Sequence, residues 1–192
     1  TTESTVVAEY TPGTRRSDGY QSEAQLEKEF IRLLCEVGYT YLPIHTEADL
    51  VANLRTQLEK LNNYQFTDGE WERFFQQSIA NANEGIKEKT RRIQDGDTAQ
   101  AFKRDTGESK NIWLLDKKCI HNNTLQVINQ YTVSQAEGAA HDNRYDVTIL
   151  VNGLPLVHVE LKRRGVAIRE AFNQINRYKR DSFWAGSGLF DY

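Results

Sequence analysis

The chain has 192 residues, of which 39% are hydrophobic and 27% charged. This balance is typical of one globular domain and excludes an intrinsically disordered chain. No apolar run approaches the roughly 20 residues of a membrane-spanning helix, and the first residues lack the pattern of a secretory signal. Cys35 and Cys119 have no metal-ligand spacing, so we expect reduced thiols in a cytoplasmic protein rather than a zinc site. The net charge of −3 by itself argues mildly against a nucleic-acid partner.

The first half of the chain carries mostly helical signals after an irregular lead-in over 1–20. Ser22 and Gln25 have the spacing of a capping box, and the helix that they begin is expected to end at Gly38. We expect these further elements up to residue 110: a short extended piece over 39–45, helices from Thr46, from the capping-box pair Thr67 and Glu70 and over 84–94, and an exposed loop over 95–110.

The second half changes to a strand pattern that is closed by a helix. Asn152-Gly153 between two apolar runs is a strong hairpin signal, and apolar residues recur at helical spacing over 166–180. Strands are expected over 112–115, 125–133, 145–151 and 156–162, with a loop over 134–144. The order predicts an α/β core with a helical insertion at about 47–94.

The predicted hairpin brings two acidic residues together. Alternate residues of a strand share a face, so Glu160 and Lys162 point the same way. If Asn152–Leu154 form a three-residue loop, Asp146 falls opposite Glu160 on that face. A loop of two or four residues would put Asp146 on the wrong face, so the hypothesis requires an odd loop length or a bulge.

Two carboxylates and a lysine that converge in this way suit phosphodiester hydrolysis. Magnesium prefers one or two carboxylates together with waters and phosphate oxygens, and it stabilises developing charge and activates a water. Lys162 could orient that water, assist its deprotonation or neutralise the phosphate. The backbone carbonyl of Leu161 could be a further ligand.

A Glu-x-Lys sequence alone is usually a solvated strand face. Here it lies in the apolar run VHVELK, which favours a central strand over an edge strand. Asp146 likewise lies within YDVTILV, where an acidic residue is costly unless it has a purpose. This context favours a catalytic interpretation.

Two groups of polar residues follow the acidic motif. Gln174 and Tyr178 are four residues apart and share one helix face, where a surface glutamine and a half-buried tyrosine are the alternative. Four arginines are phosphate contacts or, almost equally, solvated surface: Arg163, Arg164, Arg177 and Arg180. A local basic stripe beside an acidic site reconciles a DNA partner with the negative net charge.

These residues resemble a known nuclease superfamily. Asp146…Glu160-Leu161-Lys162, followed by Gln174-Ile175-Asn176-Arg177-Tyr178, is similar to the PD-(D/E)xK nucleases in the branch with a Q-x-x-x-Y motif. The block over 143–178 and the stretches SEAQLEKEFIRLL and KNIWLLDKK look like the N-terminal endonuclease domain of the type I restriction enzyme R subunit, and the resemblance covers nearly the whole chain. It implies a restriction-endonuclease-like core, with a mixed central sheet flanked by helices, that cuts double-stranded DNA with Mg²⁺.

The resemblance also implies a role for each matched residue. A glutamate of the first helix often completes the acidic cluster, and Glu27 is the first choice here with Glu23, one turn away, as the alternative. The other implied roles are Mg²⁺ binding by Asp146 and Glu160, a catalytic lysine at Lys162, and support of the site and contact with DNA by Gln174 and Tyr178.

The sequence departs from the family pattern at two points. Tyr145 stands where the superfamily name has proline, a position that is loosely kept in this family. No G-x-x-x-x-G-K-[ST] phosphate loop occurs, so we expect 1–192 to be a single nuclease domain without the ATP-driven motor of the R subunit. The methyltransferase and specificity subunits of the bacterial complex are then partners through the full-length subunit. The alternatives are a stand-alone repair or recombination nuclease and a non-catalytic docking module.

Overall fold

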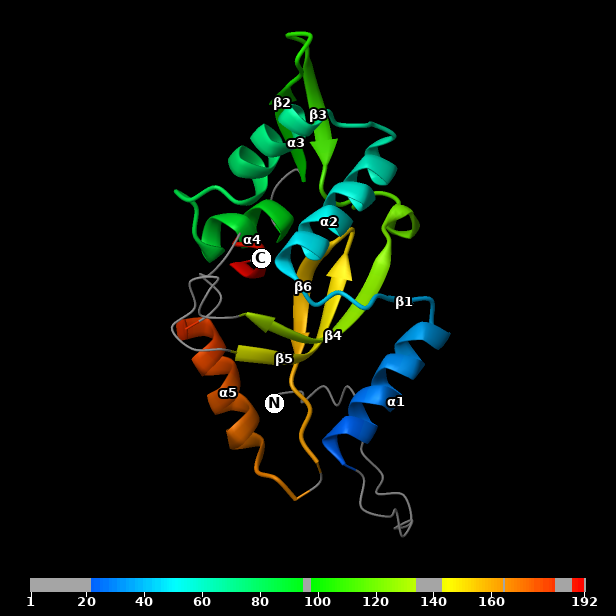
Figure 1. Ribbon diagram of the computed structural model, residues 1–192, viewed down its shortest axis with the longest axis vertical. Coiled ribbons are helices and arrows are strands. Elements are labelled where there is room, and N and C mark those ends of the chain that lie inside the picture. Colours follow the sequence, from blue (N-terminus) through cyan, green and yellow to red (C-terminus); the bar gives the residue numbers. More distant parts are fainter. Residues whose placement is uncertain (1–21, 95–97, 134–142, 164, 182–187, 192) are drawn as a thin grey trace, which may run out of the picture.

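The fold is built around a mixed four-stranded sheet, in a computed structural model that describes residues 22–94, 98–133, 143–163, 165–181 and 188–191 (Figure 1). β1 runs parallel to β4, and the other neighbouring strands are antiparallel. This confirms the predicted α/β class with a mixed sheet flanked by helices. No helix among the described residues is long and apolar enough to cross a membrane. In sheet order the strands are β1 (Thr40–Tyr41), β4 (Leu125–Val133), β5 (Asn143–Val151) and β6 (Leu154–Val159).

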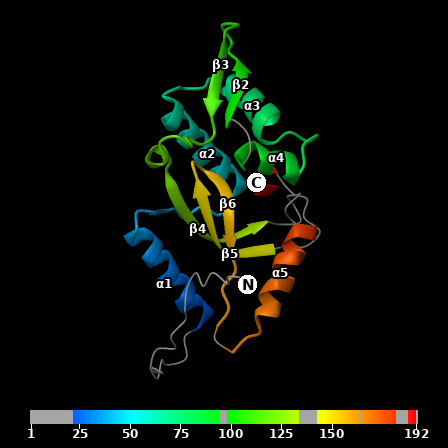
Figure 2. The ribbon, with the colours of Figure 1, turned by 180° about the vertical axis from the view of Figure 1, so that it is seen from behind.

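Two helices lie on either side of one end of the sheet, α1 (Glu23–Glu36) and α5 (Ile168–Asp181) (Figures 1 and 2). The predicted capping box begins α1, because Ser22 Oγ accepts from the Gln25 amide at 3.2 Å and the Gln25 side chain accepts from the Ser22 amide at 2.8 Å. The helix ends before Gly38, whose φ of +102° suits glycine. Both ends of the predicted first helix are therefore confirmed.

The helical stretch predicted over 47–94 is also confirmed. Leucines at helical spacing give α2 one fully buried stripe, as the sequence pattern requires. The capping box at Thr67 and Glu70 begins α3, which continues directly into a π-helix over Phe75–Ile79. The helices are α2 (Glu47–Asn62), α3 (Asp68–Phe74) and α4 (Ile86–Gln94).

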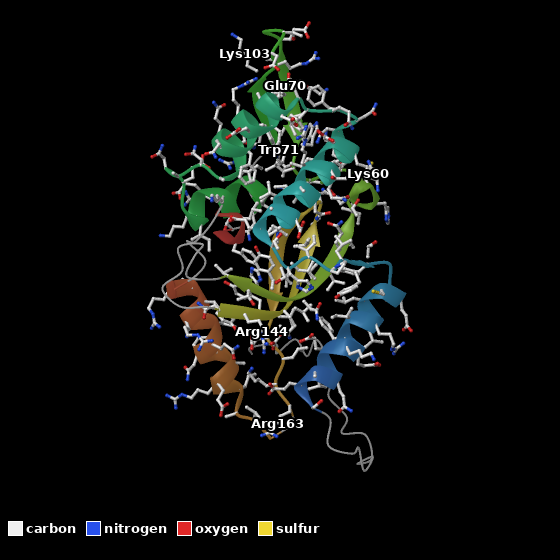
Figure 3. The ribbon with its side chains drawn as sticks, in the orientation of Figure 1. Lys60, Glu70, Trp71, Lys103, Arg144 and Arg163 are labelled. Atoms are coloured by element: carbon white, nitrogen blue, oxygen red, sulfur yellow. The ribbon has the colours of Figure 1, made fainter. Side chains whose placement is uncertain are left out.

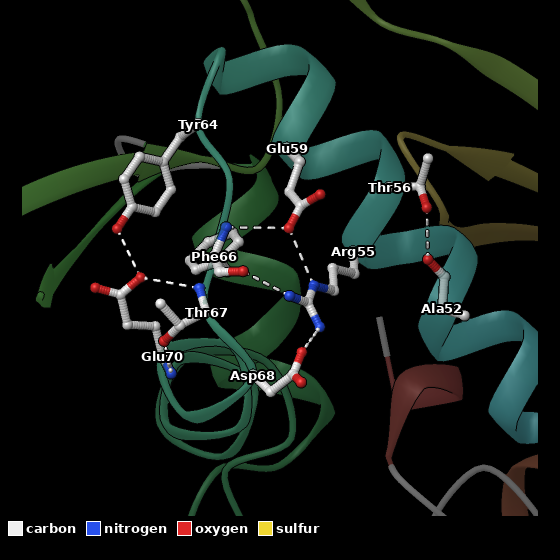
Figure 4. Close-up of polar contacts among 9 residues, drawn as sticks. All are labelled: Ala52, Arg55, Thr56, Glu59, Tyr64, Phe66, Thr67, Asp68 and Glu70. Atoms are coloured by element: carbon white, nitrogen blue, oxygen red, sulfur yellow. Dashed lines mark hydrogen bonds and ion pairs between the residues drawn. The ribbon is translucent and has the colours of Figure 1, made fainter. Parts of the chain in front are cut away.

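Charged side chains tie the connection between α2 and α3 in place (Figure 4). Arg55 donates to Glu59 at 3.0 Å and to Asp68 at 2.7 Å, and it also donates to the Phe66 carbonyl at 2.6 Å. The buried Glu70 carboxylate accepts from the Tyr64 hydroxyl at 2.7 Å. Each buried polar group of this connection is therefore paired, which limits the cost of burying it.

The exposed loop predicted over 95–110 is wrong over 99–103 and 109–110, where strands form, and 95–97 lie outside the described residues. Ala99–Lys103 form β2, which pairs antiparallel with β3 (Ser109–Trp113) in a separate hairpin that projects at the top of Figure 1. The turn residue Gly107 has a φ of +87°. Phe102 and Ile112 are buried on the inner face, whereas polar residues occupy most of the rest. The Gly- and Asp-rich composition of this stretch indicates only the turn. The strand β2 forms because it pairs with β3.

The hairpin between β5 and β6 has a two-residue turn. Val151 pairs with Leu154, and Asn152 and Gly153 form the turn with φ angles of +50° and +83°. The predicted three-residue loop is therefore wrong. Positive φ at both central residues is the geometry of a type I′ turn, which Asn-Gly favours.

A bulge in β6 restores the register that the acidic motif requires. Leu150 pairs with Pro155, but Ile149 pairs with Val157, so Leu156 is the extra residue. Beyond the bulge the pairing runs on to Val147 and Val159, and its continuation sets Asp146 opposite Glu160. The predicted alternative of a bulge is confirmed.

The predicted central strand over 156–162 is wrong in position and extent. β6 ends at Val159, and among the described residues it lies at the edge of the sheet. Val157 is 46% exposed, so the apolar sequence of β6 does not mean that both faces of this strand are buried. The helix predicted over 166–180 is confirmed as α5, but of its apolar positions only Tyr178 is buried, whereas Ile168, Phe172 and Ile175 are exposed.

Candidate active site

Three predicted catalytic residues meet where β6 ends. Lys162 Nζ lies 2.9 Å from Glu160 Oε1, and the Glu160 side chain is only 3% exposed. On the partner strand, Asp146 Oδ2 accepts a hydrogen bond of 2.9 Å from the Leu161 backbone amide. The chain after Val159 therefore stays beside Asp146, and Asp146, Glu160 and Lys162 form one acidic cluster with Lys162 as its cation.

The charges of this cluster perturb one another. Burial raises the pKa of the Glu160 carboxyl, and the neighbouring Asp146 carboxylate raises it further, although the hydrogen bond from Lys162 acts against both. Burial alone would lower the pKa of Lys162, but the Glu160, Asp146 and Glu23 carboxylates outweigh burial and hold this pKa above its usual range. A repulsive pair of carboxylates with a protonated lysine is an arrangement that an added cation would stabilise.

Helix α5 supplies the second polar pair. The Tyr178 hydroxyl lies 2.7 Å from the Arg144 carbonyl and 3.2 Å from Glu160 Oε2, and it accepts a hydrogen bond from the Gln174 amide. One hydroxyl carries one proton, so Tyr178 donates to the carbonyl or to the carboxylate at a given moment. Burial raises the pKa of Tyr178, which therefore stays protonated and able to donate.

A cluster of packed aromatic rings holds Tyr178 in this position. The Tyr145 ring lies 4.6 Å from the Tyr178 ring and 5.0 Å from His158, and Phe190 of the short helix over Leu189–Asp191 stacks on Tyr145 at 5.1 Å. Burial lowers the pKa of His158 to about 4, so the ring is neutral at physiological pH and serves packing. The site thus has a rigid aromatic support on the side of α5.

The two candidate glutamates of α1 have different surroundings. Glu27 Oε1 accepts from Asn129 at 2.6 Å, and its other oxygen accepts from Gln130, so both oxygens face β4. Glu23 lines the same cleft as Lys162 and its charge raises the pKa of Lys162. The geometry therefore favours Glu23, the alternative, over Glu27 as a further acidic group of the cluster.

A cleft of about 1000 Å³ opens between the start of α1 and the exposed side of α5. Lys162, Arg163 and Arg177 line it together with Gln174. Arg163 is exposed at the end of the molecule where the chain enters α5 (Figure 3), and the Arg177 guanidinium lies 5.5 Å from the centre of the Tyr178 ring. The acidic cluster thus borders a basic groove, whereas Arg164 lies outside the described residues.

The donor set is compatible with magnesium rather than zinc. Among the described residues no three His, Cys, Asp or Glu side chains are grouped to hold a metal ion. Magnesium needs only one or two carboxylates and keeps several waters, and Asp146 and Glu160 supply two neighbouring carboxylates on one side of the cluster. Both cysteines are free and exposed, and they are remote from this pair in the sequence.

One contribution to the site carries no signal in the sequence. The Arg144 carbonyl anchors Tyr178, and a backbone group of this kind leaves no trace in residue type. Arg180, a candidate phosphate contact from the sequence, also lines the cleft.

Comparison with known sequences shows the family of the chain. The profile of the family described as "Type I restriction enzyme R protein N terminus (HSDR_N)" matches residues 20–192. The chain belongs to this family. It is 47% identical over 188 residues to the "Type I restriction enzyme EcoprrI endonuclease subunit" of Escherichia coli, a match that covers 97% of the chain. It is 40% identical over 178 residues, 90% of the chain, to the "Type I restriction enzyme SsaAORF53P endonuclease subunit" of Staphylococcus saprophyticus.

These relatives are longer than the chain. The match spans 58% of the length of the E. coli protein and 18% of the length of the staphylococcal protein. The HSDR_N region is therefore one part of the longer relatives, and the acidic cluster of Asp146, Glu160 and Lys162 lies within the matched residues.

Proposed function

We propose that this HSDR_N chain is the magnesium-dependent endonuclease domain of a type I restriction enzyme R subunit and hydrolyses phosphodiester bonds of double-stranded DNA. The observation that carries the proposal is the convergence of Asp146, Glu160 and Lys162 beside a basic cleft. The names of the relatives agree with it, since they are endonuclease subunits. On the motif pattern, the proposal includes membership of the PD-(D/E)xK nucleases in the Q-x-x-x-Y branch.

In this proposal Asp146 and Glu160 hold Mg²⁺, with the Leu161 carbonyl as a further ligand and a glutamate of α1 completing the acidic cluster. The ion, when bound, supplies Lewis-acid stabilisation of the developing phosphate charge and a more acidic water. Lys162 lies beside Glu160 and donates to the attacking water or to a phosphate oxygen.

The residues of α5 position the cluster and the substrate. The Tyr178 hydroxyl donates either to Glu160 or to the Arg144 carbonyl, which keeps α5 against β5, while Gln174 orients that hydroxyl. Arg163 and Arg177 neutralise phosphates along the cleft, and Arg164 is proposed for the same role. These contacts fix the duplex without reading its bases, so the isolated domain should cut with weak or no sequence preference.

The wider complex is part of the proposal. The ATP-driven motor belongs to other parts of the R subunit, and the methyltransferase and specificity subunits are partners of the full-length subunit in the bacterial cytoplasm. Two alternatives remain: a stand-alone repair or recombination nuclease of the same superfamily, and a docking module whose acidic cluster is idle.

The test is plasmid nicking by the purified chain with Mg²⁺. Lys162→Ala and Asp146→Ala should abolish nicking while the melting temperature changes little, because both residues are only partly buried. Lys60→Ala, an exposed lysine on α2 at a distance from Arg163 (Figure 3), is the matched control and should cut normally. Cleavage that survives in a clean preparation of either site variant would defeat the proposal.

A magnesium titration separates the nuclease from a docking module. Calorimetry should show Mg²⁺ binding by the wild-type chain and its loss in Asp146→Asn, a substitution that keeps the size of the side chain. A docking module predicts equal heats for both proteins.

A further inference from the structure

The conformation of Gln130 is unusual for a residue inside a strand. It has a φ of +52° in the interior of β4 and is not a glycine, a conformation that costs about 1 kcal/mol or more. Its neighbours Asn129 and Tyr131 pair with Val147 and Tyr145, so Gln130 lies opposite Asp146, where the ladder is interrupted. The strained residue of β4 thus faces a residue of the acidic cluster.

This conformation explains an otherwise forbidden contact. Successive side chains of a regular strand point to opposite faces, yet Asn129 and Gln130 both donate to the carboxylate of Glu27, one to each oxygen. The Tyr41 hydroxyl donates to Asn129 Oδ1 at 2.9 Å and fixes the orientation of that amide. Glu27 therefore acts as a clamp that two consecutive residues can reach only when Gln130 is left-handed.

The kink has consequences for β5 as well. In Figure 1 the last residues of β4 and the first residues of β5 run across the view, at an angle to the rest of both strands. The turned part of β5 carries the Arg144 carbonyl that anchors Tyr178 and the Tyr145 ring that packs on it. Asp146 lies at the interruption of the ladder opposite Gln130, and its carboxylate accepts from the Leu161 amide.

We infer that Glu27 and Gln130 are positioning residues: the Glu27 clamp holds the left-handed kink at Gln130 and thereby sets Asp146 and Arg144 for the site. This inference rests on the proposed function, and it assigns Glu27 a role other than that of a metal ligand. It predicts that the site needs Glu27 only because a glutamine at position 130 is strained at positive φ. A glycine at position 130 adopts that φ without strain and makes the clamp dispensable.

The experiment is a set of variants with a metal-free readout. Hydrogen exchange of the Leu161 amide reports whether Asp146 keeps its place, because that amide donates to it. Glu27→Ala should raise this exchange rate about tenfold and lower kcat for nicking by about the same factor, with little change in KM for DNA. The double variant Glu27→Ala/Gln130→Gly should return both quantities to near the wild-type values.

Three comparisons make the outcome decisive. Glu29→Ala removes an exposed glutamate of the same helix that is ion-paired to Arg32, and it should change neither quantity. Glu27→Gln keeps the size of the side chain, and it replaces Glu27→Ala in the same measurements if Glu27→Ala does not fold. The inference is overturned if Glu27→Ala leaves the exchange rate of the Leu161 amide unchanged. It is also overturned if adding Gln130→Gly to Glu27→Ala does not restore that rate and kcat, because no rescue is expected if Glu27 is a metal ligand. If the wild-type chain does not cut DNA but the exchange pattern holds, the proposed nuclease fails and the clamp stands.

Discussion

A methyl group at Gly153 tests how tightly the β5–β6 hairpin is seated. The turn lies against α2, and a Cβ built on Gly153 would lie 2.6 Å from the Leu54 Cα and 3.0 Å from its amide nitrogen. Both are backbone atoms, so neither can move aside as a flexible side chain would. The same glycine has a φ of +83°, which an alanine adopts only with strain.

The expected cost of Gly153→Ala follows from these two terms. Backbone strain at positive φ is about 1–2 kcal/mol, and overpacking a filled site costs about 1–3 kcal/mol. Together they give about 3 kcal/mol, a large share of the roughly 5–15 kcal/mol that stabilises a domain. For a chain of this size, the melting temperature should fall by about 6–12 °C.

Gly107 provides a matched control. Its φ of +87° is almost the same, but an added Cβ there would meet nothing within 4 Å. Gly107→Ala should therefore cost only the strain, about 1 kcal/mol. Urea unfolding followed by circular dichroism measures both variants. Equal losses of stability would show that contact with Leu54 contributes nothing, and the structural argument would be refuted.

Three further predictions concern charged residues. Glu160→Gln should abolish nicking but raise the free energy of unfolding by about 1 kcal/mol, because it removes a desolvated charge next to Asp146; unchanged or lower stability in urea would contradict this. Burial raises the pKa of Glu70, but hydrogen bonds from Asp105, Tyr64 and Thr67 outweigh it and lower that pKa. The stability that Glu70 contributes is thus present above the usual glutamate pKa and lost as the pH falls through the lowered value, so Glu70→Gln should flatten the acid limb of a stability–pH curve. Arg177→Ala should weaken DNA binding and reduce the slope of log Kd against log salt by about 1, as measured by fluorescence anisotropy.

Helix ends were predictable from the sequence because the signals that set them are local. Ser22 with Gln25 and Thr67 with Glu70 satisfy the first amides of a helix within four residues, and both capping boxes form as expected. The leucine stripe of α2 is equally local, since every fourth residue returns to one face. These patterns fixed the helical part of the fold without any knowledge of its partners.

Strands and their edges were harder to predict because pairing partners are distant in sequence. β2 has no β-branched residue, and only its pairing with β3 makes it a strand. The apolar run of β6 suggested a central strand, yet Val157 is exposed at the sheet edge. The choice between Glu23 and Glu27 could not be made from the sequence for the same reason, because Asn129 and Gln130 lie about a hundred residues beyond the helix that they contact.

The acidic pair itself depends on one residue that no local signal identifies. Val151 pairs with Leu154, so unbroken pairing from this turn would set Asp146 against Val159 and leave Glu160 on the opposite face. Pro155 has no amide hydrogen and is suited to an irregular position in a strand, and the extra residue Leu156 follows it directly. The bulge moves the register by one and brings Glu160 opposite Asp146. The sequence motif names the two carboxylates, but a single unpaired residue at the far end of the strand is what makes them neighbours.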